Sequence, residues 1–134
     1  MLMGILDKST GCIKRYCDCH LKVKRMPSTE KETQKAILQY LEAKKIFHWR
    51  NNTGGTMLNN HFVSYGYKGS PDIICVIKND SEGNIGRFLG IEVKDIKGKM
   101  NANQELFKEN LERSGGIYLL ARSIDDVTEF FETL

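Results

Sequence analysis

The sequence lacks a long hydrophobic run and any internal repeat or low-complexity segment. No apolar stretch approaches the roughly 20 residues that cross a bilayer, so we expect no membrane partner. The opening residues, MLMGILDKSTGCIK, hold too short an apolar stretch for a signal peptide, and no small-residue cleavage site follows them. We therefore expect a cytoplasmic protein. Its 134 residues, 40% of them hydrophobic, suffice for one core of a globular domain.

A strong overall charge is also absent. The net charge is +3, of which residues 1–28 carry +4 and the remaining residues −1. The body of the chain is therefore not basic, and an anionic partner must be held by a local patch or by the N-terminal arm, residues 1–26. The arm either aids solubility or contacts nucleic acid, and charge alone does not decide between these roles.

Cysteine is scarce and unevenly placed. Cys75 lies in an apolar run, where a buried small hydrophobic side chain is the simplest interpretation. Three further cysteines and a histidine form the cluster C-x4-C-x-C-H at Cys12, Cys17, Cys19 and His20. Four potential ligands in nine residues indicate zinc, but two of them are adjacent and no second pair is well separated. A reduced segment without metal is the other interpretation.

Residues 27–134 show alternating helical and strand patterns. The capping-box pair Thr29 and Glu32 predicts a helix over 30–44. Strand patterns and two more helical patterns follow, with strands at 46–52, 61–67, 72–78, 87–96 and 116–122 and helices at 101–115 and 123–134. A Gly/Asn-rich loop is predicted at 52–60. This order predicts an α/β domain with a central mixed β-sheet flanked by helices.

Several burial patterns follow from these elements. The continuous apolar run at 73–77 predicts a strand buried on both faces. Leu106, Phe107 and Leu111 share one face of their helix. For the aromatic side chains at 47 and 49, we favour core packing over base stacking.

Side-chain alternation places two charged residues together on a predicted strand. Residues i and i+2 of a strand share a face, so Glu92 and Lys94 stand together while Ile91 and Val93 face the core. If the neighbouring strands pair, Asp72 and Glu92 converge at a solvent-open end of the sheet. Two hard oxygen ligands without a thiolate suit Mg²⁺ or Mn²⁺ better than zinc. Lys94 beside them can activate a water or stabilise charge on a phosphate.

The first helix offers a third carboxylate. At 100° per residue, Glu30 lies within about 20° of Ile37 and Leu41, so we expect it to point inward, whereas Glu32 points to solvent. Structural interpretations stand beside these. Glu30 can simply favour a helix N-terminus, Asp72 can serve a turn, and the Glu92–Lys94 spacing can be a surface ion pair.

Taken together, these segments resemble a known family. The sequence pairs GSPD with EVK 20 residues later, which is similar to the PD-(D/E)xK nuclease motif. Further stretches resemble its virus-type replication-repair nuclease (VRR-NUC) branch: EKETQKAILQYL, FHWRNNTGG, GYKGSPDIICV, GRFLGIEVK, NANQELFKENLERSGGIYLLARS and DDV. The likeness covers 30–127, with KMNANQ in place of a more usual LSPEQ-like run. It implies a restriction-endonuclease-like fold over 27–134.

The resemblance also implies an activity, a divalent-metal-dependent phosphodiesterase that cuts DNA. Its catalytic residues would be Glu30, Asp72, Glu92, Lys94 and Gln104, and its metal ligands Glu30, Asp72, Glu92 and the carbonyl of Val93. Family members of this size resemble homodimers that cut branched DNA such as Holliday junctions, in bacterial or phage-infected cells. One alternative is a nucleic-acid-binding module with weak catalysis on the same fold, and another is a hydrolase that uses the carboxylate pair without metal.

Residues near the motif offer nucleic-acid contacts and a dimer surface. Phosphate donors are expected at Arg50 and Lys68, close backbone approach at Gly69, and a polar loop around Asn51. Two patches are candidates for a dimer interface, the 52–60 loop and the last helix; their apolar members are Met57, Leu58, Val127, Phe130 and Phe131. Core packing is the other interpretation of the two phenylalanines.

Overall fold

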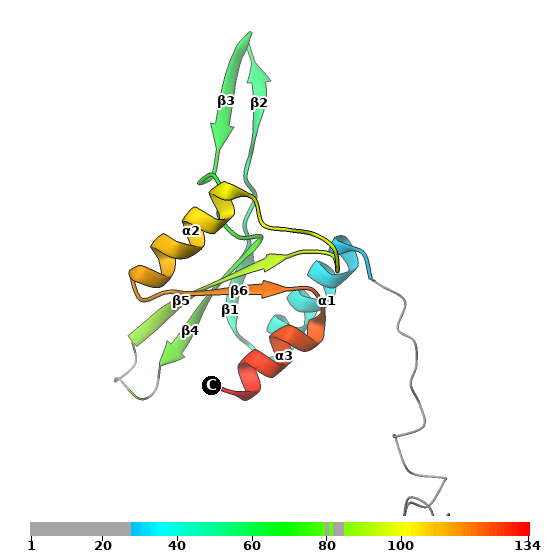
Figure 1. Cartoon of the computed structure of the whole chain (residues 1–134), viewed down its shortest axis with the longest axis vertical. Helices are drawn as coiled ribbons and strands as arrows, with labels where there is room; N and C mark the ends of the chain where they lie inside the picture. Colours follow the sequence, from blue (N-terminus) through cyan, green and yellow to red (C-terminus); the bar gives the residue numbers. More distant parts are fainter. Residues whose placement is uncertain (1–27, 80, 82–84) are drawn as a thin grey trace, which may run out of the picture.

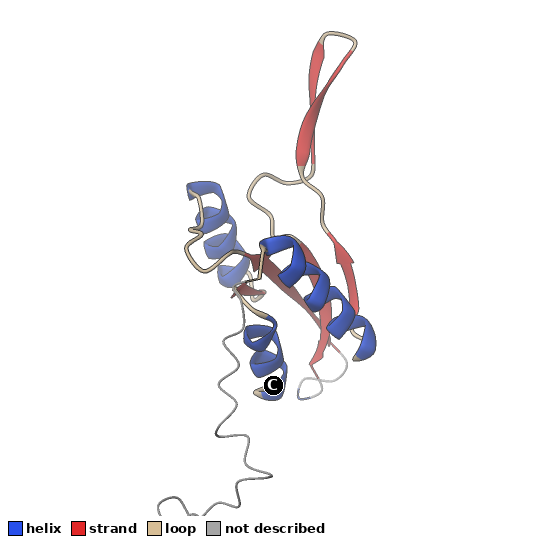
Figure 2. Ribbon diagram, turned by 90° about the vertical axis from the view of Figure 1, so that its right-hand side faces the viewer, coloured by secondary structure: helices blue, strands red, loops and turns tan. Residues whose placement is uncertain are grey.

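The computed structural model describes residues 28–79, 81 and 85–134. It has a four-stranded mixed sheet that carries helices, and a two-stranded hairpin that projects away from this body (Figures 1 and 2). The predicted mixed α/β architecture, with a mixed sheet flanked by helices, is confirmed. The N-terminal arm, with Cys12, Cys17, Cys19 and His20, lies outside the described residues, so its predictions stay as they are.

The elements follow the predicted order with one addition. The helices are α1 (Glu30–Ala43), α2 (Ala102–Arg113) and α3 (Ile124–Glu132). The strands are β1 (Phe47–Arg50), β2 (Gly54–Leu58), β3 (His61–Tyr65), β4 (Ile73–Asn79), β5 (Ile85–Val93) and β6 (Ile117–Ala121). No helix in the described part of the chain is both long and apolar enough to cross a membrane.

The main sheet has the strand order β1-β4-β5-β6. β4 pairs antiparallel with both β1 and β5, whereas β5 and β6 are parallel and are joined through α2. The register sets Ile73 opposite Ile91, and Val93 opposite Ala121. This arrangement brings the start of β4 and the end of β5 to the same end of the sheet.

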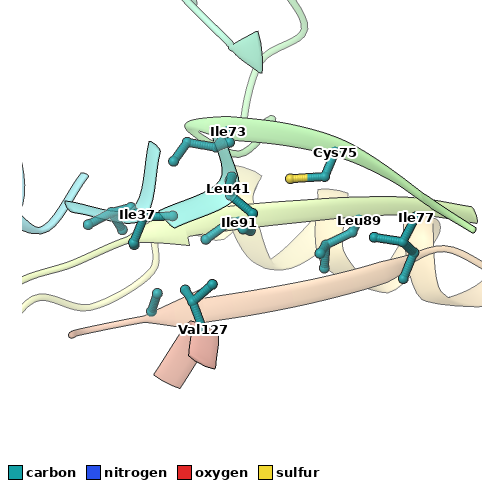
Figure 3. Packing of buried hydrophobic residues seen from close by; sticks show 10 residues of the cluster. Ile37, Leu41, Ile73, Cys75, Ile77, Leu89, Ile91 and Val127 are labelled. Atoms are coloured by element: carbon teal, nitrogen blue, oxygen red, sulfur yellow. The ribbon is translucent and has the colours of Figure 1, made fainter. Parts of the chain in front are cut away.

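The core lies between one face of this sheet and the helices α1 and α3 (Figure 3). Ile37 from α1 and Val127 from α3 are fully buried against Ile73, Leu89 and Ile91 of the central strands. α2 serves the other face, where its Phe107 packs against Tyr118 of β6 with ring centroids 6.4 Å apart. The two faces of β5 therefore differ: one is apolar core, and the other meets the N-terminal turn of α2.

The capping box predicted for α1 is confirmed, and α2 begins with a second one that was not predicted. Thr29 caps α1 in a reciprocal capping box with Glu32, and Asn101 caps α2 in the same way with Gln104. Each box supplies hydrogen-bond partners for two backbone N–H groups that a helix start would otherwise leave unpaired. They also fix where the first turn of each helix begins, and these turns carry Glu30 in α1 and Gln104 in α2.

The predicted loop at 52–60 is wrong, because it contains β2. This strand pairs with β3 around Asn59 and Asn60, whose positive φ angles of 48° and 62° are those of a tight hairpin turn. Every residue of β2 and β3 is exposed. The hairpin therefore has no buried face that would produce an alternating hydrophobic pattern.

Other burial predictions also fail. β4 is not buried on both faces, since Val76 is exposed while Ile73, Cys75 and Ile77 are buried. Phe47 and Trp49 are not core residues: they lie on the edge strand β1, exposed by 69% and 43%, with ring centroids 5.7 Å apart. The shared reason is that α2 covers only part of its face of the sheet.

The helical surfaces need two corrections. Leu106 does not share the inward face of α2, because it is 56% exposed. Val127 is fully buried, and Phe130 and Phe131 pack partly buried against the core. Of the two interpretations of the last helix, core packing is therefore the one that the structure shows.

Candidate active site

The pairing of β4 and β5 brings two carboxylates together. Ile73 lies opposite Ile91, so continuing this register by one residue places Asp72 across from Glu92. Asp72 Oδ2 accepts a hydrogen bond of 2.8 Å from the backbone N–H of Val93. This bond holds the Asp72 side chain against the end of β5, and it leaves Oδ1 outside that contact.

Glu92 is the buried centre of the cluster. Its side chain is only 2% exposed, which corrects the prediction that it stands at a solvent-open sheet end. Lys94 Nζ lies 2.9 Å from Glu92 Oε1, and the amide of Gln104 donates to the same oxygen. Glu92 Oε2 has no hydrogen-bond partner among the described residues, although it is buried. A buried carboxylate oxygen without a partner is costly in a folded protein and calls for a ligand.

The N-terminal turn of α2 sets the orientation of Gln104. Its Oε1 accepts from the backbone N–H of Asn101 at 3.0 Å, and its backbone N–H donates to Asn101 Oδ1 at 3.0 Å. With the amide oxygen held by the cap, the amide nitrogen is directed to Glu92. A single residue therefore links the helix start to the buried carboxylate.

Glu30 reaches the site from α1, but it is not inward-pointing among apolar residues as predicted. Its side chain is exposed, and Oε1 accepts from the backbone N–H of Asp95 at 3.3 Å, just beyond the end of β5. Glu32, predicted to point to solvent, is exposed and accepts from Thr29 in the capping box. The two carboxylates of the first turn thus have separate roles.

The charges of the cluster act on one another. Burial raises the pKa of Glu92 above its ordinary value, and the carboxylates of Asp72 and Glu30 add to this, while Lys94 opposes it. Burial lowers the pKa of Lys94, but its ion pair with Glu92 and the charges of Glu30 and Asp72 outweigh burial and raise it overall. Lys94 is therefore an ammonium at neutral pH, suited to stabilising negative charge rather than to accepting a proton.

A divalent cation fits this set of residues. The unpartnered Oε2 of buried Glu92 lies in a group of like charges with Asp72 and Glu30, which a cation would neutralise. Carboxylate oxygens without thiolate or imidazole suit Mg²⁺ or Mn²⁺. Within residues 28–79, 81 and 85–134, no three His, Cys, Asp or Glu side chains form a complete metal site. Water or a backbone carbonyl, such as that of Val93, would have to complete the shell.

The predicted nucleic-acid contacts are distributed around this cluster. Asn51 has a structural role: its amide donates to Ser70 Oγ at 2.7 Å and to the carbonyl of Pro71 at 2.9 Å.

Arg50 lies opposite Ile73 in the β1–β4 register, so it belongs to the other face of the sheet from Glu92. Lys68 and Gly69 lie between the hairpin and Asp72, where they line a hollow.

Tyr118 is a site residue that the sequence did not reveal. It lies on β6 opposite Gly90, its hydroxyl is buried, and that hydroxyl has no hydrogen-bond partner among the described residues. Burial raises the pKa of Tyr118, and the charges of Glu92 and Asp72 and a side-chain interaction with Glu92 raise it further. The Tyr118 hydroxyl is therefore an O–H donor that lies beside the Glu92 carboxylate. Only the strand register, not any local motif, identifies this neighbour.

Comparison with known proteins adds no assignment. No protein-family model matches the chain, and no curated protein matches it.

Proposed function

We propose that the protein is a divalent-metal-dependent DNA endonuclease with a restriction-endonuclease-like fold. The observation that carries the proposal is the buried carboxylate of Glu92, whose Oε2 lacks a partner while Lys94 and Gln104 hold Oε1. Asp72 across the strand pair and Glu30 from α1 add negative charge around it. Three carboxylates around one lysine support a cation-binding site better than a structural ion pair between Glu92 and Lys94 alone.

The chain's own residues suit hydrolysis of a phosphodiester. Asp72 and Glu92 would hold the ion, with Val93 offering a carbonyl and Glu30 a further carboxylate. When bound, such an ion lowers the pKa of the attacking water and neutralises charge on the phosphate oxygens. The Lys94 ammonium would stabilise the charge that develops during cleavage. Gln104 would keep Glu92 in one orientation.

Branched DNA such as a Holliday junction is the proposed substrate, cut by a homodimer. A four-way junction needs two cuts, and a two-fold dimer supplies two sites at a fixed spacing. Of the two predicted interface patches, the last helix is core, which leaves the hairpin tip as the candidate dimer interface. Its residues Met57 and Leu58 are 63% and 59% exposed. Light scattering should give twice the 15.3 kDa of the chain; a monomer with and without junction would contradict paired cutting.

A cleavage assay tests the proposal. End-labelled four-way junction, linear duplex and single strand are incubated with the protein in Mg²⁺, Mn²⁺ or EDTA. We expect cleavage only with metal, and fastest on the junction. Binding without cleavage would instead identify a nucleic-acid-binding module, and cleavage in EDTA would identify a metal-free hydrolase.

A further inference from the structure

A hollow of about 510 Å³ lies at the base of the β2–β3 hairpin, next to the candidate active site. Its lining includes the aromatic residues Phe62 and Tyr65, the glycines Gly66 and Gly69, and the cation Lys68. The volume falls within the roughly 300–1,000 Å³ of pockets that hold small ligands. The proposed cleavage chemistry does not use these groups.

The aromatic rings of the hairpin lie against its glycines. A Cβ on Gly55 would lie 2.2 Å from Cζ of Phe62, so the Phe62 ring lies across the strand at that point. A Cβ on Gly54 would likewise lie 2.8 Å from the hydroxyl of Tyr65. Phe62 is nevertheless 70% exposed and Tyr65 52% exposed. Exposed aromatic side chains are the groups on which bases stack in proteins that bind single strands.

The charge of the segment points to a nucleotide. Residues 51–71 contain no Asp or Glu, and Lys68 is their only Lys or Arg. The strands β2 and β3 carry neither, so they have no cation to bind the phosphates of a duplex. The aromatic ring of Phe62 and the single nearby cation, Lys68, are instead enough to bind one base and its phosphate.

The distribution of apolar groups argues against a second copy as the occupant. Met57 and Phe62 form one cross-strand pair, whereas Val63 and Tyr65 alternate to the opposite face of the hairpin. A two-fold interface needs one self-complementary patch. The hollow at the base of the hairpin therefore does not favour a second copy, and the candidate dimer residues Met57 and Leu58, nearer the tip, are not among the residues that line it.

The hollow is joined to the candidate active site by close packing. Gly69 has a φ of 85°, and a Cβ there would lie 2.3 Å from the carbonyl oxygen of Asn103, the residue before Gln104. On the other side, the Asn51 backbone N–H donates to the carbonyl of Asp72 at 2.8 Å. A strand held in the hollow would therefore continue toward Asp72 and Glu92.

We propose that this hollow binds one unpaired nucleotide of a DNA strand, with its base stacked on Phe62 and its phosphate at Lys68. The inference rests on the proposed function for the choice of DNA and for the role of holding the strand to be cut. Nucleotide binding itself needs neither metal nor cleavage, so it is measured separately.

The test is fluorescence anisotropy of a labelled oligothymidylate in EDTA, using the full chain. Phe62→Ala should weaken binding about tenfold, as expected when base stacking is lost. Gly55→Ala should also weaken it, because the added methyl displaces the Phe62 ring while the ring remains present. Ile85→Ala is the control: Ile85 is 54% exposed at the end of β5 that lies away from Glu92, and its loss should not change binding.

Salt dependence separates stacking on Phe62 from phosphate binding at Lys68. Lys68→Ala should reduce the slope of log affinity against log salt by about 0.7, the value for one phosphate of a single strand. Phe62→Ala should leave that slope unchanged, because stacking releases no counterions.

The inference is overturned if wild type fails to bind the oligothymidylate, or if Phe62→Ala binds as tightly as Ile85→Ala. It is also overturned if light scattering shows that Phe62→Ala converts a dimer to a monomer, since a second copy would then occupy the hairpin. Phe62-dependent binding by a wild-type protein that cleaves no DNA supports the hollow and contradicts only the proposed function. Cleavage with binding independent of Phe62 contradicts only the hollow.

Discussion

Gln104 donates its side-chain N–H to Oε1 of Glu92, while its own amide oxygen is held by the backbone N–H of Asn101. The capping box of α2 is therefore also the support of the buried carboxylate. Because a backbone N–H provides the hold on the amide oxygen, that hold does not depend on which side chain residue 101 carries.

This arrangement predicts different effects for two substitutions in one cap. Asn101→Ala removes the side-chain cap and should cost about 1 kcal/mol of folding free energy, with cleavage largely retained. Gln104→Leu should cost a similar amount, but it also leaves Glu92 without its amide donor and should reduce cleavage at least tenfold. Urea unfolding and single-turnover cleavage measure the two effects. Equal cleavage by both variants would show that Gln104 has no role in the site beyond capping the helix.

The first turn of α1 offers a second matched pair. Glu30→Ala should strongly reduce cleavage with little change in stability, because Glu30 is exposed and lies near Lys94 and Glu92. Glu32→Ala should lower the free energy of unfolding and retain cleavage, because Glu32 serves the capping box. Similar losses of cleavage in the two variants would contradict this division.

Glu32 also predicts a pH dependence. Hydrogen bonds from the backbone and hydroxyl of Thr29 hold its pKa below the ordinary value of 4.5. A lowered folded-state pKa contributes stability that is present above the unfolded pKa and lost as pH falls through the folded pKa. The stability difference between wild type and Glu32→Ala should therefore shrink in acid. Urea unfolding at neutral and acidic pH measures it, and a difference that grows in acid would contradict the capping assignment.

Cys75 tests the packing of β4. It is fully buried, and burial raises the pKa of its thiol to about 12. At mildly alkaline pH the thiol is thus both inaccessible and protonated, so alkylation should occur only after unfolding. Peptide mapping by mass spectrometry resolves Cys75 from the cysteines of the arm. Rapid labelling of native Cys75 would contradict the described core.

Removal of residues 1–25 tests the arm. The helical and strand patterns of the sequence begin after Met26, so the domain should remain folded by circular dichroism. If the arm binds nucleic acid, its six basic residues neutralise phosphates. DNA binding should then depend less steeply on salt when the arm is removed. The slope of log affinity against log salt should fall by about 0.9 for each phosphate that the shortened protein no longer neutralises. An unchanged slope would assign the arm to solubility.

Local patterns predicted the parts of the site that depend on one element. Alternation along β5 placed Glu92 with Lys94 and sent Ile91 and Val93 to the core, because a strand has a fixed period of two. Helical phase was less successful for Glu30. Helical phase predicted that Glu30 points inward with the apolar stripe of α1. The first turn of α1 extends past the apolar core, so Glu30 contacts the backbone of Asp95 rather than core side chains.

Features that depend on tertiary pairing could not be predicted. β2 has no buried face and begins with two glycines, so it lacks a strand pattern, although the Asn59–Asn60 turn was a local signal for a hairpin. The burial of Glu92 and the presence of Tyr118 depend on how β5, β6 and α2 pack together. No residue spacing within a single segment contains that information.

The most direct test of the central claim compares wild type with Asp72→Asn in single-turnover cleavage of an end-labelled four-way junction. Asp72 is only partly buried, and asparagine keeps its shape and an acceptor for the N–H of Val93, so the variant should fold normally by circular dichroism. It loses the carboxylate charge that a divalent ion needs. We expect Mg²⁺-dependent cleavage by wild type and a loss of at least a hundredfold in Asp72→Asn. Undiminished cleavage by folded Asp72→Asn, or cleavage by wild type in EDTA, would contradict the claim.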